Sequence, residues 1–243
     1  MSEVKVNKLS PRSGTTVTLG DSGDTFSIPS GATLSNSGST TFAGNLSVDG
    51  GTIKLDGNYP TGSNNVAMGD NALNSVASDG NSNTVMGNNA GTAITTGDLN
   101  VGIGAGALLD TTTASNNTAV GGIALCANTT GACNVAVGAC ALLNNTTADD
   151  NTAVGMNALC LNTTGCRNTA IGHNSMDVNT TGEFNTALGR SSLSGNTTAD
   201  NNTAVGYHSM LANTTGTENT AVGSGALDSN TTDGCNTSIG HGS

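Results

Sequence analysis

The feature that most constrains this chain is a pentad, Asn-x-x-apolar-Gly, that recurs eleven times between Asn65 and Ser243. After one interval of 18 residues, every interval between pentad asparagines is 17 residues. Ten full repeats and a truncated eleventh have the consensus NTAVGxxALxxNTTxxx, whose positions we number as columns one to seventeen. This period is too short for two helices and a turn, and Asn, Thr and Gly are poor helix formers. The repeat therefore predicts the coil of a β-solenoid, which at roughly 4.8 Å per coil would be about 50 Å long.

Two short strands per coil, T-A-V at columns two to four and A-L at columns eight and nine, fit the repeat length and its β-branched residues. Corners would separate them, so we expect positive φ at the Gly of column five and at the Asn of columns one and twelve. Stacked Asn side chains can also form a hydrogen-bonded ladder from coil to coil. The ladder and corner residues predicted in the central repeats are Asn117, Gly121, Asn134, Gly138, Asn151, Gly155, Asn168, Gly172, Asn185, Gly189, Asn202 and Gly206.

The apolar columns leave two arrangements open. Column four is always Met, Ile, Val or Leu, column three is small except at Val85, and column nine is Leu or Met except at Gly91. Strand alternation would put columns three and four on opposite faces, and likewise columns eight and nine. Either the large residues fill the coil, or Ala fills a tight coil while Val and Leu pack against neighbouring chains. Apolar residues on both faces favour an oligomer.

Composition excludes several classes of protein. Aromatic residues make up 2% of the chain and Trp is absent, so the bulk of a conventional enzyme core is missing. We therefore predict no enzymatic activity, no catalytic residues and no cofactor. Six basic residues against 17 acidic ones give a net charge of -11, which argues against binding to nucleic acid or an anionic membrane. No apolar run is long enough for a signal peptide or a transmembrane helix, so we expect cytoplasmic assembly without membrane insertion.

The NTAVGxxAL units resemble the head repeats of YadA-like trimeric adhesins, and still more the NTAIGxxALxxNTTG arrays of bacteriophage tail-fibre proteins. The resemblance covers Asn65 to Ser243. It implies a homotrimer whose chains form a left-handed parallel β-roll. It also implies a structural role in host attachment.

The first sixty residues resemble something different. From Val17 to Leu55, short Thr, Val, Ile and Phe runs are broken by Gly, Ser, Asp and Pro, which is typical of strands and turns. We predict a β-rich segment over residues 1–60, followed by the solenoid shaft over residues 61–243. The segment is similar to the N-terminal stretches of fibre proteins from marine phages, particularly those of cyanobacteria. This implies docking to a tail, baseplate or neck protein and localisation in the virion.

Column six varies freely from repeat to repeat, so it must face surroundings that do not constrain it. At and beside this column, four residues supply hydrogen-bonding and stacking groups: His173, Arg190, Tyr207 and His208. If the rod touches a host surface glycan or protein receptor, these residues are the candidates. The His residues do not show a metal-binding HxH spacing, and we predict no metal site.

Six cysteines occur, and none forms a CxxC motif: Cys126, Cys133, Cys140, Cys160, Cys166 and Cys235. Cys126 and Cys160 share a column two coils apart, about 9.6 Å, which exceeds the usual Cα separation of a disulfide. We expect mostly reduced thiols. The recurring NTT triplets match the N-glycosylation sequon, but one per coil is better explained by a structural ladder.

Three alternatives to a phage fibre follow from the sequence. An ice-binding β-solenoid is suggested by Thr at columns thirteen and fourteen, although adjacent residues point to opposite faces and form no Thr-x-Thr ladder. A fragment of a bacterial YadA-like adhesin is the second. A polysaccharide-degrading tail spike is the third, and it would need an acidic pair in one groove, whereas the corner carboxylates are scattered.

Overall fold

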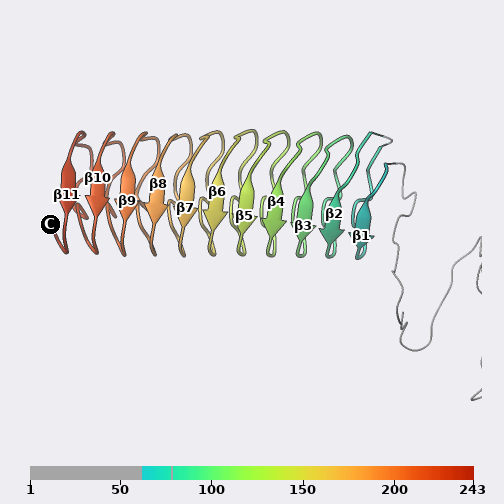
Figure 1. Cartoon of the computed structure of the whole chain (residues 1–243), viewed down its shortest axis with the longest axis horizontal. Coiled ribbons are helices and arrows are strands. Elements are labelled where there is room, and N and C mark those ends of the chain that lie inside the picture. The colour runs from blue at the N-terminus through green and yellow to red at the C-terminus, as the bar shows by residue number, and fades with distance from the viewer. Residues whose placement is uncertain (1–61, 78) are drawn as a thin grey trace, which may run out of the picture. The chain divides into compact units, whose positions relative to one another are not determined.

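The computed structural model describes residues 62–77 and 79–243, and these form a β-solenoid. Eleven strands pair in parallel, each with the next along the chain, in one sheet. Figure 1 shows the coils stacked in chain order, with one strand of each coil in the sheet. The strands are β1 (Val66–Met68), β2 (Thr84–Met86), β3 (Val101–Ile103), β4 (Thr118–Val120), β5 (Val135–Val137), β6 (Thr152–Val154), β7 (Thr169–Ile171), β8 (Thr186–Leu188), β9 (Thr203–Val205), β10 (Thr220–Val222) and β11 (Thr237–Ile239). The predicted all-β solenoid with 17-residue coils is confirmed, whereas the predicted segment 1–60 lies outside the described residues.

Each coil has one strand, so the second predicted strand at columns eight and nine is wrong. That segment is a turn, and its column-nine residue has a positive φ, for example 52° at Leu125. The left-handed conformation costs roughly 1–2 kcal/mol for a residue with a side chain. Full burial of a Leu side chain contributes about 1.5–3 kcal/mol, which offsets that cost. Parallel stacking still continues through the turn, because Leu125 N–H donates to the carbonyl of Ala141 in the next coil at 2.9 Å.

The interior of the coil combines both arrangements that the sequence left open. In β4, Ala119 of column three is fully buried and Val120 of column four points outward. At the turn, Ala124 of column eight and Leu125 of column nine are both fully buried. Strand alternation holds for columns three and four but fails for columns eight and nine, because those two residues are in a turn rather than a strand. Ala and Leu together fill the coil.

The two exceptions in the repeat compensate for one another. Val85 is the large residue of column three and Gly91 the small residue of column nine, and both belong to the same coil. A Cβ at Gly91 would lie 3.0 Å from a Val85 methyl carbon and 2.9 Å from the Ile94 side chain. Val85 and Ile94 therefore occupy the space that Leu fills elsewhere, which keeps the interior packed without a void.

Glycine at column five is required twice over. Gly138 has a φ of 135°, a conformation that side-chain-bearing residues rarely adopt. A Cβ at this position would lie 2.5 Å from the carbonyl oxygen of Gly155, its counterpart in the next coil. The predicted positive φ at this corner is confirmed, and the close stacking of coils excludes any side chain there.

The asparagine ladder is confirmed, but its asparagines do not have positive φ as the sequence predicted. Asn134 of column one is fully buried. Its main-chain N–H donates to Asn117 Oδ1 at 2.9 Å, and its side-chain Nδ2 donates to the Ala148 carbonyl at 2.8 Å. Asn145 of column twelve donates from Nδ2 to the same carbonyl at 3.0 Å. The positive φ values instead occur at columns five, seven, nine and seventeen. Asparagine is needed at columns one and twelve because a buried amide can donate and accept at once.

Candidate functional site

The outward face of the sheet is lined by columns two and four, and we call it the outer face. Column four is apolar and partly exposed in every coil, for instance 37% at Ile171 and 45% at Leu188. Its members are Met68, Met86, Ile103, Val120, Val137, Val154, Ile171, Leu188, Val205, Val222 and Ile239. An unbroken apolar column on a surface otherwise rich in Asn, Thr and Asp indicates an interaction face.

Threonines of column two stand beside this apolar column. From Thr152 to Thr237, six consecutive coils carry Thr there, and their hydroxyls make no hydrogen bond within the described residues. The threonines of column thirteen differ, since Thr146 Oγ1 donates to the carbonyl of Thr163 at 3.1 Å and this bond recurs along the rod. The threonines of column fourteen, such as Thr181 and Thr215, also make no side-chain hydrogen bond within the described residues, but column two shares its face with the apolar column four. Nothing in the repeat pattern distinguished these two columns from column thirteen.

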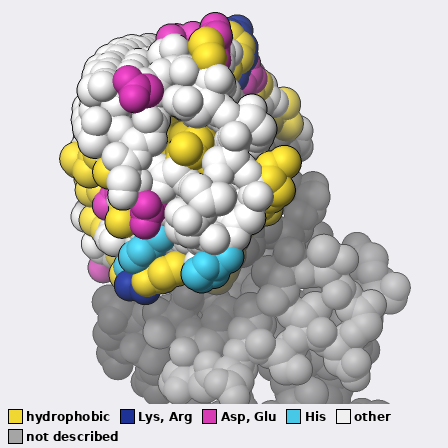
Figure 2. Space-filling view, turned by 90° about the vertical axis from the view of Figure 1, so that its left-hand side faces the viewer, with side chains coloured by type: hydrophobic (Ala, Val, Ile, Leu, Met, Phe, Trp, Pro, Cys, Tyr) yellow, Lys and Arg dark blue, Asp and Glu magenta, His cyan; other side chains and the backbone are white. Residues whose placement is uncertain are grey.

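The structure brings together three of the four predicted contact residues. The Arg190 guanidinium lies 5.7 Å from the centre of the Tyr207 ring, and the Tyr207 and His208 rings stack at 3.7 Å with an interplanar angle of 17°. We call Arg190, Tyr207 and His208 the corner patch. Figure 2 looks onto the C-terminal end of the solenoid, where His, basic and hydrophobic side chains gather at one corner of the coil.

His173, the fourth candidate, lies one coil before Arg190 in the same column. Among the described residues, its buried Nδ1 has no hydrogen-bond partner, and no ring or ion-pair contact joins its side chain to the corner patch. It interacts electrostatically with Asp177 instead. Burial raises the pKa of Asp177 above its ordinary value, although its own main-chain N–H, His173 and the Ser194 hydroxyl act in the opposite direction.

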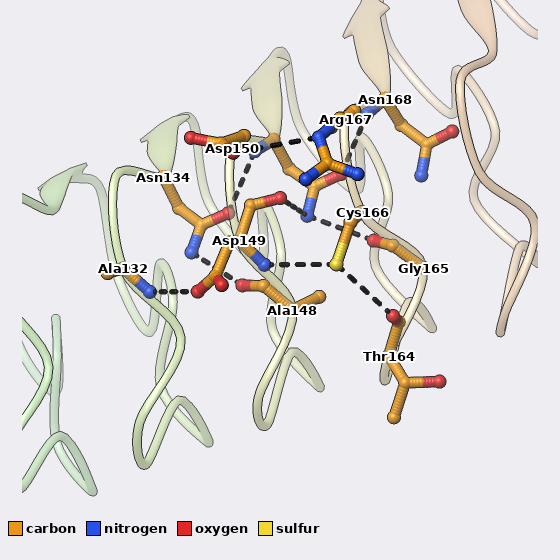
Figure 3. Close-up of polar contacts among 11 residues, drawn as sticks. Ala132, Asn134, Ala148, Asp149, Asp150, Thr164, Gly165, Cys166, Arg167 and Asn168 are labelled. Carbon is orange, nitrogen blue, oxygen red and sulfur yellow. Dashed lines mark hydrogen bonds and ion pairs between the residues drawn. The ribbon is translucent and has the colours of Figure 1, made fainter.

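A second cation–aromatic pair, at column seventeen, was not predicted from the sequence. The Arg167 guanidinium lies 5.3 Å from the centre of the Phe184 ring, and its Nε lies 3.9 Å from Asp150 Oδ2. Figure 3 shows Arg167 and Asp150 facing one another across neighbouring coils. Because the repeat places equal columns of successive coils side by side, an Arg seventeen residues before an aromatic residue was the signal that could have found this pair.

All six cysteines are free thiols. Cys166 has a structural role, since its Sγ accepts a hydrogen bond from Asp149 N–H at 3.4 Å (Figure 3). Burial raises the pKa of Cys126, with a further contribution from Asp110. Burial also raises the pKa of Cys160, assisted by Cys140 and Asp177. Thiols with raised pKa values are poor nucleophiles at neutral pH.

Within residues 62–77 and 79–243, no three His, Cys, Asp or Glu side chains gather as a metal site would require. No helix in that same part of the chain is long and apolar enough to cross a membrane. The chain matches no protein family, no curated protein and no solved structure.

Proposed function

We propose that this protein is a structural fibre of a bacteriophage, a homotrimer whose N-terminal segment docks on the virion and whose solenoid reaches the host surface. The observation that carries the proposal is the apolar column four on the outer face. Ala and Leu already fill the interior of the rod, so the eleven partly exposed apolar residues of column four are not needed to pack it. Packing the outer faces of three parallel copies together would remove this column from water along the whole rod.

The mass in solution tests the proposal. Light scattering should give about three times the chain mass of 23.7 kDa. Leu188→Lys places a charge in the middle of the outer face and should lower the mass to that of one chain, because burying an unpaired charge is costly. Thr181→Lys, at an exposed position of column fourteen, is the matched control and should keep the wild-type mass.

Two outcomes contradict this assembly. A wild-type protein with the mass of a single chain would exclude the trimer. A Leu188→Lys variant that keeps the mass of the wild-type assembly would show that the interface between chains does not lie on the outer face. Labelling of purified virions with an antibody against the solenoid tests the location of the protein separately.

A second candidate, an ice-binding solenoid, is favoured by the free threonine hydroxyls of column two. On the outer face, Thr and apolar residues alternate with a spacing of about 6.7 Å along a strand and about 4.8 Å between coils, a regular array that can order water. The two functions exclude one another, because a trimer would cover this face. Thermal hysteresis by a monomer, lost in Thr203→Tyr and retained in Thr215→Tyr, would favour ice binding over the fibre.

A further inference from the structure

Arg190 is an unneutralised cation on an acidic rod. Residues 62–243 contain two basic residues, Arg167 and Arg190, against twelve Asp and Glu. Arg167 is paired with Asp150, whereas Arg190 makes no ion pair within the described residues. In a shaft with so few cations, an exposed guanidinium without a carboxylate leaves its charge available to a ligand.

The corner patch also presents an aromatic surface. Tyr207 is 46% exposed, the His208 imidazole stacks on its ring at 3.7 Å, and the Arg190 guanidinium lies 5.7 Å from the ring centre. Stacking restrains all three groups, so binding a ligand would cost little side-chain entropy. The phenol hydroxyl, the imidazole and the guanidinium offer hydrogen-bond donors next to apolar ring surface.

We propose that Arg190, Tyr207 and His208 form a binding site for an acidic saccharide. The carboxylate of a uronic acid matches the planar fork of the guanidinium, which can donate two parallel hydrogen bonds to it. The apolar C–H face of the same sugar ring matches the aromatic surface beside Arg190. A neutral sugar would leave the cation unpaired, and a small inorganic anion would leave the aromatic surface unused.

Asp177 limits where the ligand can lie. This carboxylate interacts with His173, one coil before Arg190, and would repel an anion at that end of the column. The ligand is therefore expected over Arg190 and Tyr207 rather than over His173. This inference names the receptor class for the proposed attachment function, on which its biological meaning rests, but saccharide binding can be measured on the purified protein alone.

Calorimetric titration of the full chain with trigalacturonic acid tests the proposal. The wild-type protein should bind this acid and should bind its neutral methyl ester at least about tenfold more weakly, because the ester lacks the charge-assisted bonds. Arg190→Gln should weaken binding of the acid about tenfold or more, and Tyr207→Ala should weaken it severalfold. Arg167→Gln is the matched control, since it removes the other stacked arginine, and it should bind as the wild type does.

The site is refuted if the wild type does not bind the acid, if acid and ester bind equally, or if Arg167→Gln loses as much affinity as Arg190→Gln. If inorganic phosphate occupies the site as tightly as trigalacturonic acid does, the site binds anions in general. That result would also refute the saccharide proposal. The fibre proposal is tested by a different measurement, the mass in solution. Either proposal can therefore be refuted without the other.

Discussion

Asn117 and Asn134 are joined by a hydrogen bond of 2.9 Å from the main-chain N–H of Asn134 to Oδ1 of Asn117. The same bond links the column-one asparagines of every pair of neighbouring coils from Asn65 to Asn236. Each asparagine thus supports the next coil through its Oδ1, and it supports its own coil through its Nδ2, which for Asn134 donates to the Ala148 carbonyl. The stability of the rod therefore depends on contacts between neighbouring repeats, as in other solenoids.

Replacing one ladder asparagine in the middle of the rod should be strongly destabilising. Asn151→Ala leaves the buried N–H of Asn168 without its acceptor at 2.9 Å, and it removes the donor to the Gly165 carbonyl at 3.0 Å. We expect a loss of about 2–4 kcal/mol in the free energy of unfolding, measured by denaturant titration. Asn144→Ala is the control, because Asn144 is half-buried and its side chain makes no hydrogen bond to any residue that the structure describes. Its replacement should change the free energy of unfolding by less than about 0.5 kcal/mol. Equal losses in both variants would contradict the ladder.

Two adjacent glycines of one corner should respond in opposite ways to alanine. Gly121→Ala places a Cβ 2.5 Å from the Gly138 carbonyl oxygen at a φ of 140°, so we expect misfolding or a loss of about 3 kcal/mol or more. A Cβ added at Gly122 would meet no atom within 4 Å, and the φ of this residue is not positive. Gly122→Ala should be neutral or stabilise by roughly 0.4–1 kcal/mol, because it restricts the unfolded chain. Thermal unfolding followed by circular dichroism distinguishes the two, and a harmful Gly122→Ala would contradict this account.

Replacing Cys166 with serine should stabilise the protein. In the equivalent column, Ser115 Oγ accepts from Asp98 N–H at 2.9 Å, whereas Cys166 Sγ accepts from Asp149 N–H at 3.4 Å. Oxygen is the better acceptor, so Cys166→Ser should raise the free energy of unfolding by about 0.5–1 kcal/mol. Cys133→Ser, at an exposed position without this contact, should change it little. A Cys166→Ser variant less stable than Cys133→Ser would refute the acceptor role.

Glu218 should control the reactivity of Cys235. The Sγ–H of Cys235 donates to Glu218 Oε2 at 3.3 Å, and this hydrogen bond together with the carboxylate charge raises the pKa of the thiol. Because only the thiolate reacts, Glu218→Gln should lower that pKa and speed alkylation of Cys235 by iodoacetamide severalfold at about pH 8. The two rates should converge at a pH above the raised pKa, where both thiols are ionised. Peptide mass mapping measures the rates, with the exposed Cys133 as internal reference. Unchanged kinetics at Cys235 would exclude the contact in solution.

Much of the fold follows from the repeat itself. The 17-residue period, the corner glycine and the stacking of asparagines were all predictable, because each depends on residues that recur in equal columns. Leu125 was predicted in a strand and lies in a turn with positive φ, since its burial outweighs its local preference. The pairing of Arg190 with Tyr207 was only partly predictable: the residues were candidates, but their stacking depends on the side-chain conformations that the corner allows.

The amino-acid sequence by itself determined that this chain coils, how long each coil is, and which columns must stay Asn or Gly. Only the tertiary structure decided that Val120 points outward while Leu125 points inward, and that Gly91 accommodates Val85. It also decided which threonines keep free hydroxyls. The physical reason is that burial, hydrogen-bond partners and close approaches in a solenoid come from the neighbouring coil and the opposite side of the same coil. Neither is present in the local pattern of one repeat.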